Sequence, residues 1–171
     1  MKIVLTSTAK VFNDKGTKLV IDGGNKVTLS GGGTTRILYM ATCDKAQVYP
    51  PGPGDCNTNP GVQLVVQNIT FVDGSAKGIP EGTNNGAGGG AIYNDGNEIV
   101  LQVTSSLIEN NKANEGGSAV FFVSNNKTGS IIVKDSITRN NPRGTFETPN
   151  LPGFYVIAKA PAQVINSQIQ R

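Results

Sequence analysis

Short apolar segments recur along this 171-residue chain, separated by turns rich in glycine and asparagine. Four of these segments align when they are written one above another: residues 64–74, 101–111, 131–141 and 162–170. Each contains a valine at the equivalent position, and these valines recur at intervals of roughly 30 residues, a period expected of a solenoid. The sequence therefore predicts a repeat protein.

Within each segment the side chains alternate with the period of two that is typical of a β-strand. The residues expected to point inward are Leu64 and Val66, Leu101 and Val103, Ile131 and Val133, and Ala162 and Val164. One unit cannot bury its own apolar face, but stacked units can. Because parallel crossover connections are almost always right-handed, the pattern predicts an all-β fold, a right-handed parallel β-helix of about five coils.

The position that follows each of these strands is small and polar in every unit. The four residues are Asn68, Ser105, Asp135 and Asn166. In a stacked coil they would lie above one another and hydrogen-bond along the stack or to the turn backbone. We therefore predict that they form a structural polar ladder.

A second kind of strand lies between consecutive units and follows a glycine-rich turn. Residues 86–94 are the clearest example, and residues 116–122 and 152–158 are variants. Alternation turns one residue of each adjacent aromatic pair outward, and exposed aromatic rings can stack on sugars or contact a protein. The candidate binding residues are Tyr49, Tyr93, Phe122 and Tyr155.

Residues 43–61 have a different character, because Cys43 and Cys56 bracket a stretch rich in proline and glycine. Such a stretch is neither strand nor helix. We favour a disulfide between the two cysteines over two free thiols, and a disulfide indicates an oxidising compartment. The chain is predicted to be one domain, residues 1–171, with this loop as an insertion.

Composition excludes several classes of function. The net charge is only +3 and the basic residues are scattered singly, so nucleic acid is not an expected partner. No stretch approaches the ~18 apolar residues of a membrane-spanning helix. The chain has no histidine and two cysteines, so we predict neither a metal site nor a cofactor.

A family resemblance follows from the glycine-led strands. Residues 89–92 read Gly-Gly-Ala-Ile, the tetrapeptide that resembles the repeats of polymorphic outer-membrane proteins, and residues 117–120 are an altered copy. The associated Phe-x-x-Asn element occurs only in altered form, in residues 71–74, 108–111 and 138–141. Residues 19–31 look like the first coils of bacterial pectin-lyase-like surface proteins. The resemblance implies a secreted or cell-surface bacterial protein, on a scaffold that carries adhesins, autotransporter passengers and polysaccharide lyases alike.

A lyase on this scaffold would be expected to place acids and a basic residue on one exposed face. The best group available is Lys134, Arg139 and Glu109, but the positions in register with Lys134 offer no acid. We therefore expect a non-enzymatic, structural or adhesive module that contacts a partner protein or glycan through its flank and loops. Two alternatives stay open: a polysaccharide-active lyase or hydrolase, or a fragment of one, and a unit that self-associates end to end, because residues 2–12 and 162–171 lack the pattern of a cap.

Overall fold

The computed structural model describes residues 1–11, 17–41, 62–77, 87–125 and 127–171. The 43–61 insertion lies outside the described residues, so the disulfide between Cys43 and Cys56 and the binding role of Tyr49 stay predictions. The described part of the chain is all β, as expected. Its strands are β1 (Lys2–Val4), β2 (Ala9–Lys10), β3 (Lys18–Ser30), β4 (Leu38–Ala41), β5 (Gln63–Val72), β6 (Ile92–Asn97), β7 (Val100–Thr104), β8 (Leu107–Glu109), β9 (Val120–Asn125), β10 (Ser130–Lys134), β11 (Ile137–Arg139), β12 (Phe154–Ile157), β13 (Gln163–Ile165) and β14 (Gln168–Ile169).

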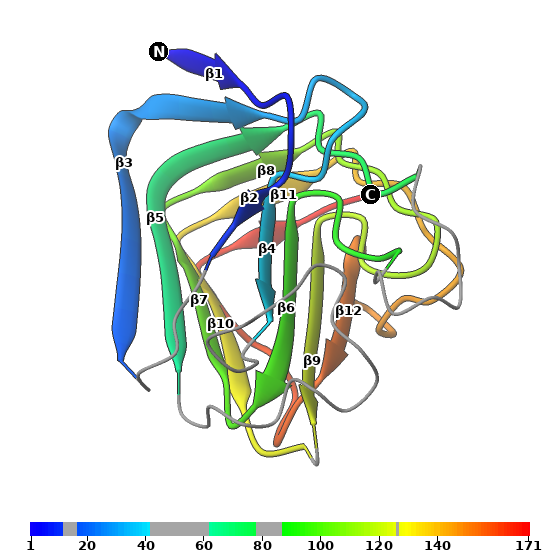
Figure 1. Ribbon diagram of the computed structural model, residues 1–171. Coiled ribbons are helices and arrows are strands. Elements are labelled where there is room, and N and C mark those ends of the chain that lie inside the picture. The colour runs from blue at the N-terminus through cyan, green and yellow to red at the C-terminus, as the bar shows by residue number, and fades with distance from the viewer. Residues whose placement is uncertain (12–16, 42–61, 78–86, 126) are drawn as a thin grey trace.

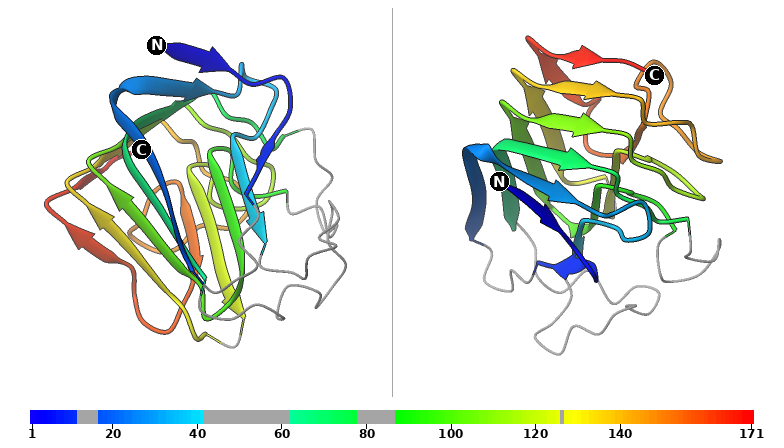
Figure 2. Two further views of the ribbon diagram at one scale, coloured as in Figure 1. Left: turned by 60° about the vertical axis from the view of Figure 1, so that its left-hand side comes forward. Right: turned by 90° about the horizontal axis from the view of Figure 1, so that it is seen from above.

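The strands form two sheets in which every pairing is parallel. The first sheet has the order β13-β10-β7-β5-β8-β11-β14, with β3 beside β5 and β1 beside β3, and the second has the order β12-β9-β6-β4-β2. Strands β3 and β5 bend sharply, so the first sheet curls around the molecule (Figure 1). The chain passes repeatedly from the first sheet to the second and back, an arrangement consistent with a solenoid. The N-terminal and C-terminal strands lie at opposite ends of the stack (Figure 2).

The alignment of the repeats is confirmed by the register of the first sheet. Val66 pairs with Val103, Val103 with Val133, and Val133 with Val164. Because side chains alternate with a period of two, a slip of one residue would turn the apolar positions outward. The recurring apolar pattern therefore determines the register.

The chain turns between the two halves of the first sheet at the four positions of the predicted polar ladder. Asn68, Ser105, Asp135 and Asn166 have φ angles of 52°, 48°, 50° and 46°. This left-handed region bends the strand and is more accessible to asparagine than to most other residues. A small polar residue at this position is thus first of all a turn residue.

At this turn Asn68 Nδ2 donates to Asp22 Oδ1 of the adjacent strand (3.1 Å), and the other hydrogen bonds along the stack come from the next position. The backbone N–H of Ser106 donates to Ser136 Oγ (3.1 Å), and the backbone N–H of Ser136 donates to Ser167 Oγ (3.0 Å). The Ser106 hydroxyl in turn donates to the carbonyl of Thr104 (2.8 Å). The serine ladder therefore lies one residue beyond the predicted one, with its first two side chains buried.

The core lies between the two sheets and continues along the stack. Large side chains with 2 % exposure or less fill it, among them Leu64, Phe71, Leu101, Ile108, Phe122 and Phe154. The placement of Phe122, at 0 % exposure, differs from the sequence-based expectation of an exposed ring. The alternation along β9 turns the neighbouring Phe121 outward instead, because Val120 and Phe122 are the residues that face the first sheet.

Candidate functional site

Four aromatic rings lie in a row on the outer face of the second sheet, and we refer to them as the aromatic row. They are Tyr39 of β4, Tyr93 of β6, Phe121 of β9 and Tyr155 of β12, which are direct partners in the strand register. Successive ring centroids are 5.0, 4.8 and 5.3 Å apart. Strands in a sheet are about 4.8 Å apart, so parallel pairing by itself brings equivalent rings into stacking distance.

The accessibility of the aromatic row increases toward β12. Tyr39 and Tyr93 are 3 % and 6 % exposed, whereas Phe121 and Tyr155 are half-buried. The row is extended by Phe146, which is 49 % exposed and whose ring lies 5.9 Å from that of Tyr155 at an angle of 41°. A ligand or partner can therefore reach only the end of the row formed by these last rings.

The buried end of the aromatic row is held by a buried arginine. Arg36 is 1 % exposed, and its guanidinium donates to the carbonyl oxygens of Gly89 (3.0 Å) and Gly88 (2.7 Å). Its Cζ also lies 4.8 Å from the centroid of the Tyr93 ring. A planar guanidinium can make these hydrogen bonds while it stacks on an aromatic face. Arg36 thus ties the glycine-rich turn before β6 to the row.

Tyr93 itself is kept neutral. Burial is the main cause that raises the pKa of Tyr93 well above its usual value, and the negative charge of Asp95 acts in the same direction. The phenol donates a hydrogen bond to Asp95 Oδ2 (3.3 Å). Tyr93 is therefore a buried hydrogen-bond donor, which supports the row from inside and leaves contact with a ligand to the outer rings.

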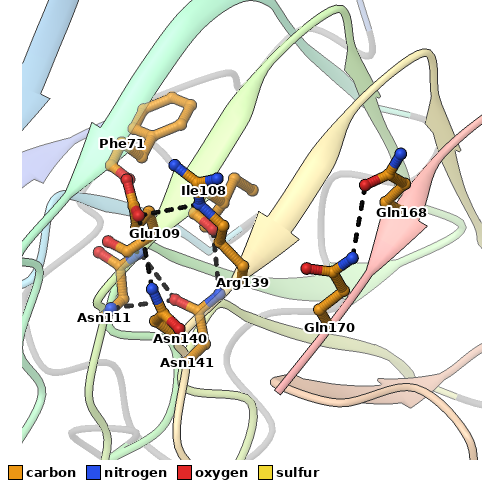
Figure 3. Close-up of polar contacts among 9 residues, drawn as sticks. All are labelled: Phe71, Ile108, Glu109, Asn111, Arg139, Asn140, Asn141, Gln168 and Gln170. Carbon is orange, nitrogen blue, oxygen red and sulfur yellow. Dashed lines mark hydrogen bonds and ion pairs between the residues drawn. The ribbon is translucent and has the colours of Figure 1, made fainter.

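The structure brings together two members of the predicted catalytic group. Arg139 Nε lies 2.9 Å from Glu109 Oε1, an ion pair between the neighbouring strands β11 and β8 (Figure 3). Lys134 of β10 has a different partner, Asp135, with 3.9 Å between Nζ and Oδ2. Both pairs are partly solvent-exposed, and pairs of this kind contribute little free energy to folding.

Below this ion pair lies an asparagine ladder that the sequence analysis did not assign. Asn111 and Asn141 are both 0 % exposed, and Asn111 Nδ2 donates to Asn141 Oδ1 (3.0 Å; Figure 3). Asn111 Oδ1 accepts from the backbone N–H of Gly74 (2.8 Å), and Asn141 Nδ2 donates to the carbonyl of Ile108 (3.0 Å). The sequence signal that could have indicated this ladder is the Asn-Asn pair that occurs at equivalent places in two repeats.

Three further observations concern metal binding, membrane-spanning helices and similarity to known proteins. Among them, no group of three or more acidic, histidine or cysteine side chains is placed to hold a metal ion. Nor does this part of the chain contain a helix of the length and apolarity needed to cross a membrane. Comparison with protein-family models, with curated proteins and with solved structures finds no match to this chain.

Proposed function

We propose that this protein is a right-handed parallel β-helix of about five coils that serves as a non-enzymatic, structural or adhesive module on a bacterial cell surface or outside the cell. Its aromatic flank and the adjoining loops contact a glycan or a partner protein. The support for the architecture is the confirmed repeat register, together with a chain path that alternates between two all-parallel sheets. The Gly-Gly-Ala-Ile motif of residues 89–92 supports a surface protein similar to polymorphic outer-membrane proteins.

The single observation that carries the binding function is the accessible end of the aromatic row. Phe146 and Tyr155 lie at an angle to each other, and Phe146 keeps nearly half of its surface exposed. Aromatic rings supply large contact areas to sugars and to protein partners, because they bury much apolar surface with few rotatable bonds. The stacked rings behind them hold this end in place, so a partner would meet a preorganised surface.

The proposal is tested with the double variant Phe146→Ala/Tyr155→Ala. The protein is immobilised, and its binding is measured to arrayed glycans and to whole cells that bear native surface proteins and glycans. The matched control is Val20→Ala, which removes an apolar side chain of 43 % exposure far from the aromatic row. We expect the double variant to lose binding while the control retains it. Equal binding by all three proteins contradicts this function.

Polysaccharide cleavage is the alternative with less support. Glu109 accepts hydrogen bonds from Arg139 (2.9 Å) and Asn140 (3.5 Å), so its carboxylate is already engaged by neighbouring side chains of this protein. A general acid must instead have its proton within hydrogen-bond reach of the substrate. The test is incubation with pectate, alginate and glycosaminoglycan. Unsaturated products that disappear in Glu109→Gln would establish the enzyme and overturn the non-enzymatic proposal.

Self-association is favoured by a separate observation at the two ends of the stack. Ile3, Leu19 and Val164 occupy inward-facing positions on the outermost strands, yet they are 37 %, 36 % and 41 % exposed. A further strand from a second copy would cover them. Sedimentation distinguishes the cases: concentration-dependent association that Val164→Lys abolishes supports stacking, with Ile137→Lys as the control. A monomer at all concentrations rejects it.

A further inference from the structure

A surface hollow of about 380 Å³ crosses the bend of the first sheet, on a different face from the aromatic row. Two rows of side chains line it, and they come from consecutive strands. The polar row consists of Asn25, Asn68, Ser105 and Asp135, and the apolar row contains Leu107 and Ile137. With strands about 4.8 Å apart, the polar row extends over about 14 Å. The hollow is therefore elongated along the stacking direction.

The polar row consists of turn residues whose side chains also line the hollow. All four members have φ angles between 48° and 59°, a region in which glycine is less strained than any residue with a Cβ. Among the described residues, glycine occupies six other positions with positive φ, and non-glycine residues occupy seven more outside the polar row. Among these side chains, Asn68 donates to Asp22 Oδ1 of the adjacent strand (3.1 Å), whereas the serine ladder provides the bonds between the later units. No hydrogen bond joins the side chain of Asn25 or Ser105 to another described residue, so both side chains are open to a ligand.

The apolar row runs beside the polar one. Leu107 and Ile137 are direct partners in the register of β8 and β11, and Ile137 is 38 % exposed. A narrow apolar strip next to a line of amide and hydroxyl groups matches a pyranose chain, which has an apolar C–H face and a hydroxyl edge. The repeat of both rows along the stack suits an extended polymer better than a compact molecule.

The charges around the hollow are internally compensated. Asp135 lies 3.9 Å from Lys134, and Arg139, at the edge of the hollow, is paired with Glu109 at 2.9 Å. Neither sign of charge is in excess, so the hollow offers no attraction to a polyanion such as pectate. Hydrogen bonding and apolar contact are the forces that remain.

From these observations we infer that the hollow binds a short, uncharged, extended oligosaccharide that lies along the stacking direction. The sugar hydroxyls hydrogen-bond to the polar row, and one face of the chain rests on Leu107 and Ile137. This site goes beyond the proposed function and does not depend on the aromatic row. It also gives three of the predicted ladder residues, Asn68, Ser105 and Asp135, a role in binding as well as in the turn.

The test is a titration of the isotope-labelled protein with cello-, xylo- and chito-oligosaccharides, followed by NMR. We expect at least one of them to shift the amide signals of residues 105–107 and 135–137 in a saturable manner. Ser105→Gly/Asp135→Gly removes two ligand-binding side chains at positions where glycine fits the backbone, and we expect it to weaken binding by about tenfold or more. The matched control is Asn110→Gly/Asn140→Gly, which changes two exposed residues with φ of 58° and 55° outside the hollow.

A second variant tests the apolar row: Ile137→Arg fills the hollow, and Val20→Arg makes the same change on an exposed residue elsewhere. We expect loss of binding only for Ile137→Arg. The inference is overturned if none of the three sugars shifts these amides, or if the hollow variants bind as well as their controls. Shifts confined to Phe121, Phe146 and Tyr155 would overturn it too, while leaving the proposed function of the aromatic row intact.

Discussion

Replacement of Asn111 by alanine tests how far the asparagine ladder stabilises the stack. The Asn111 side chain connects three successive repeat units. It accepts a hydrogen bond from the Gly74 N–H (2.8 Å) of the preceding unit and donates to Asn141 Oδ1 (3.0 Å) of the following one. Within its own unit it donates to the carbonyl oxygen of Glu109 (3.0 Å). It is completely buried. Water cannot replace these bonds without opening the turn, so the substitution leaves donors and acceptors without partners.

The expected loss follows from counting the groups that lose a partner. The N–H of Gly74, a buried residue, has no other partner in this ladder, and an orphaned buried donor costs about 1–3 kcal/mol. The carbonyl of Glu109 still accepts from Asp73 N–H (3.3 Å), and Asn141 Oδ1 still accepts from the backbone of residue 111 (3.0 Å). The bonds that the Asn111 side chain makes to these two acceptors are therefore lost at a net value of about 1 kcal/mol each. We therefore expect the free energy of unfolding to fall by about 3–5 kcal/mol.

Chemical denaturation measures this loss, and hydrogen exchange at the amide of Gly74 locates it. The control is Asn110→Gly, the neighbouring residue, which is exposed and has a φ of 58° that glycine adopts easily. Its unfolding free energy should change by no more than about 0.5 kcal/mol. The reasoning is refuted if Asn111→Ala costs as little as the control, or if the Gly74 amide keeps its protection in the variant.

Three more predictions concern the backbone and the two shifted ionisable groups. Gly89→Ala should lower the free energy of unfolding by more than about 3 kcal/mol, because the new Cβ would collide with a backbone carbonyl oxygen at a φ of +64°. The control Gly24→Ala, at a φ of +57° in open space, should lower it by only about 1–2 kcal/mol. Equal losses in chemical denaturation would contradict this prediction. Burial raises the pKa of Tyr93, so its contribution to stability is intact below the unfolded tyrosine value of about 10 and is lost as the pH rises through the higher folded pKa. Tyr93→Phe should therefore reduce the alkaline loss of stability, and an unchanged alkaline slope would exclude this origin. Hydrogen bonds lower the pKa of Asp22, and the one from Gln67 has the largest effect. The contribution of Asp22 to stability is therefore present above the pKa of an unfolded aspartate, about 3.9, and is lost as the pH falls through the lower folded pKa. Asp22→Asn should remove this part of the acid dependence in pH-dependent unfolding, and a slope equal to that of the wild type would count against it.

The repeat register could be predicted because it depends on information that is local in the chain. The inward residues at positions such as Leu64, Leu101 and Ile131 recur at the same place in each segment, and all three are buried. Alternation with a period of two requires only the strand itself. The parallel pairing of equivalent strands then follows, because each unit covers the apolar face of the next.

It was harder to predict which side chains of the glycine-led strands face the core. Phe121 and Phe122 are adjacent and equally apolar, so alternation establishes that they face opposite ways without showing which one faces inward. The contact with the first sheet decides in favour of Phe122, and Phe121 joins the aromatic row. The candidate site accordingly retained Tyr155 from the prediction and gained Phe121 and Phe146, which the sequence analysis had not selected.

The sequence by itself determined the period of the repeat, the strands and the turn positions, because these depend on the intrinsic preferences of residues close together in the chain. Only the tertiary structure decided which side chains meet across the stack. Glu109 and Arg139 are 30 residues apart in the chain and 2.9 Å apart in space. The polar row of the hollow and the aromatic row likewise exist only once the units are stacked, because each unit contributes a single member to either row.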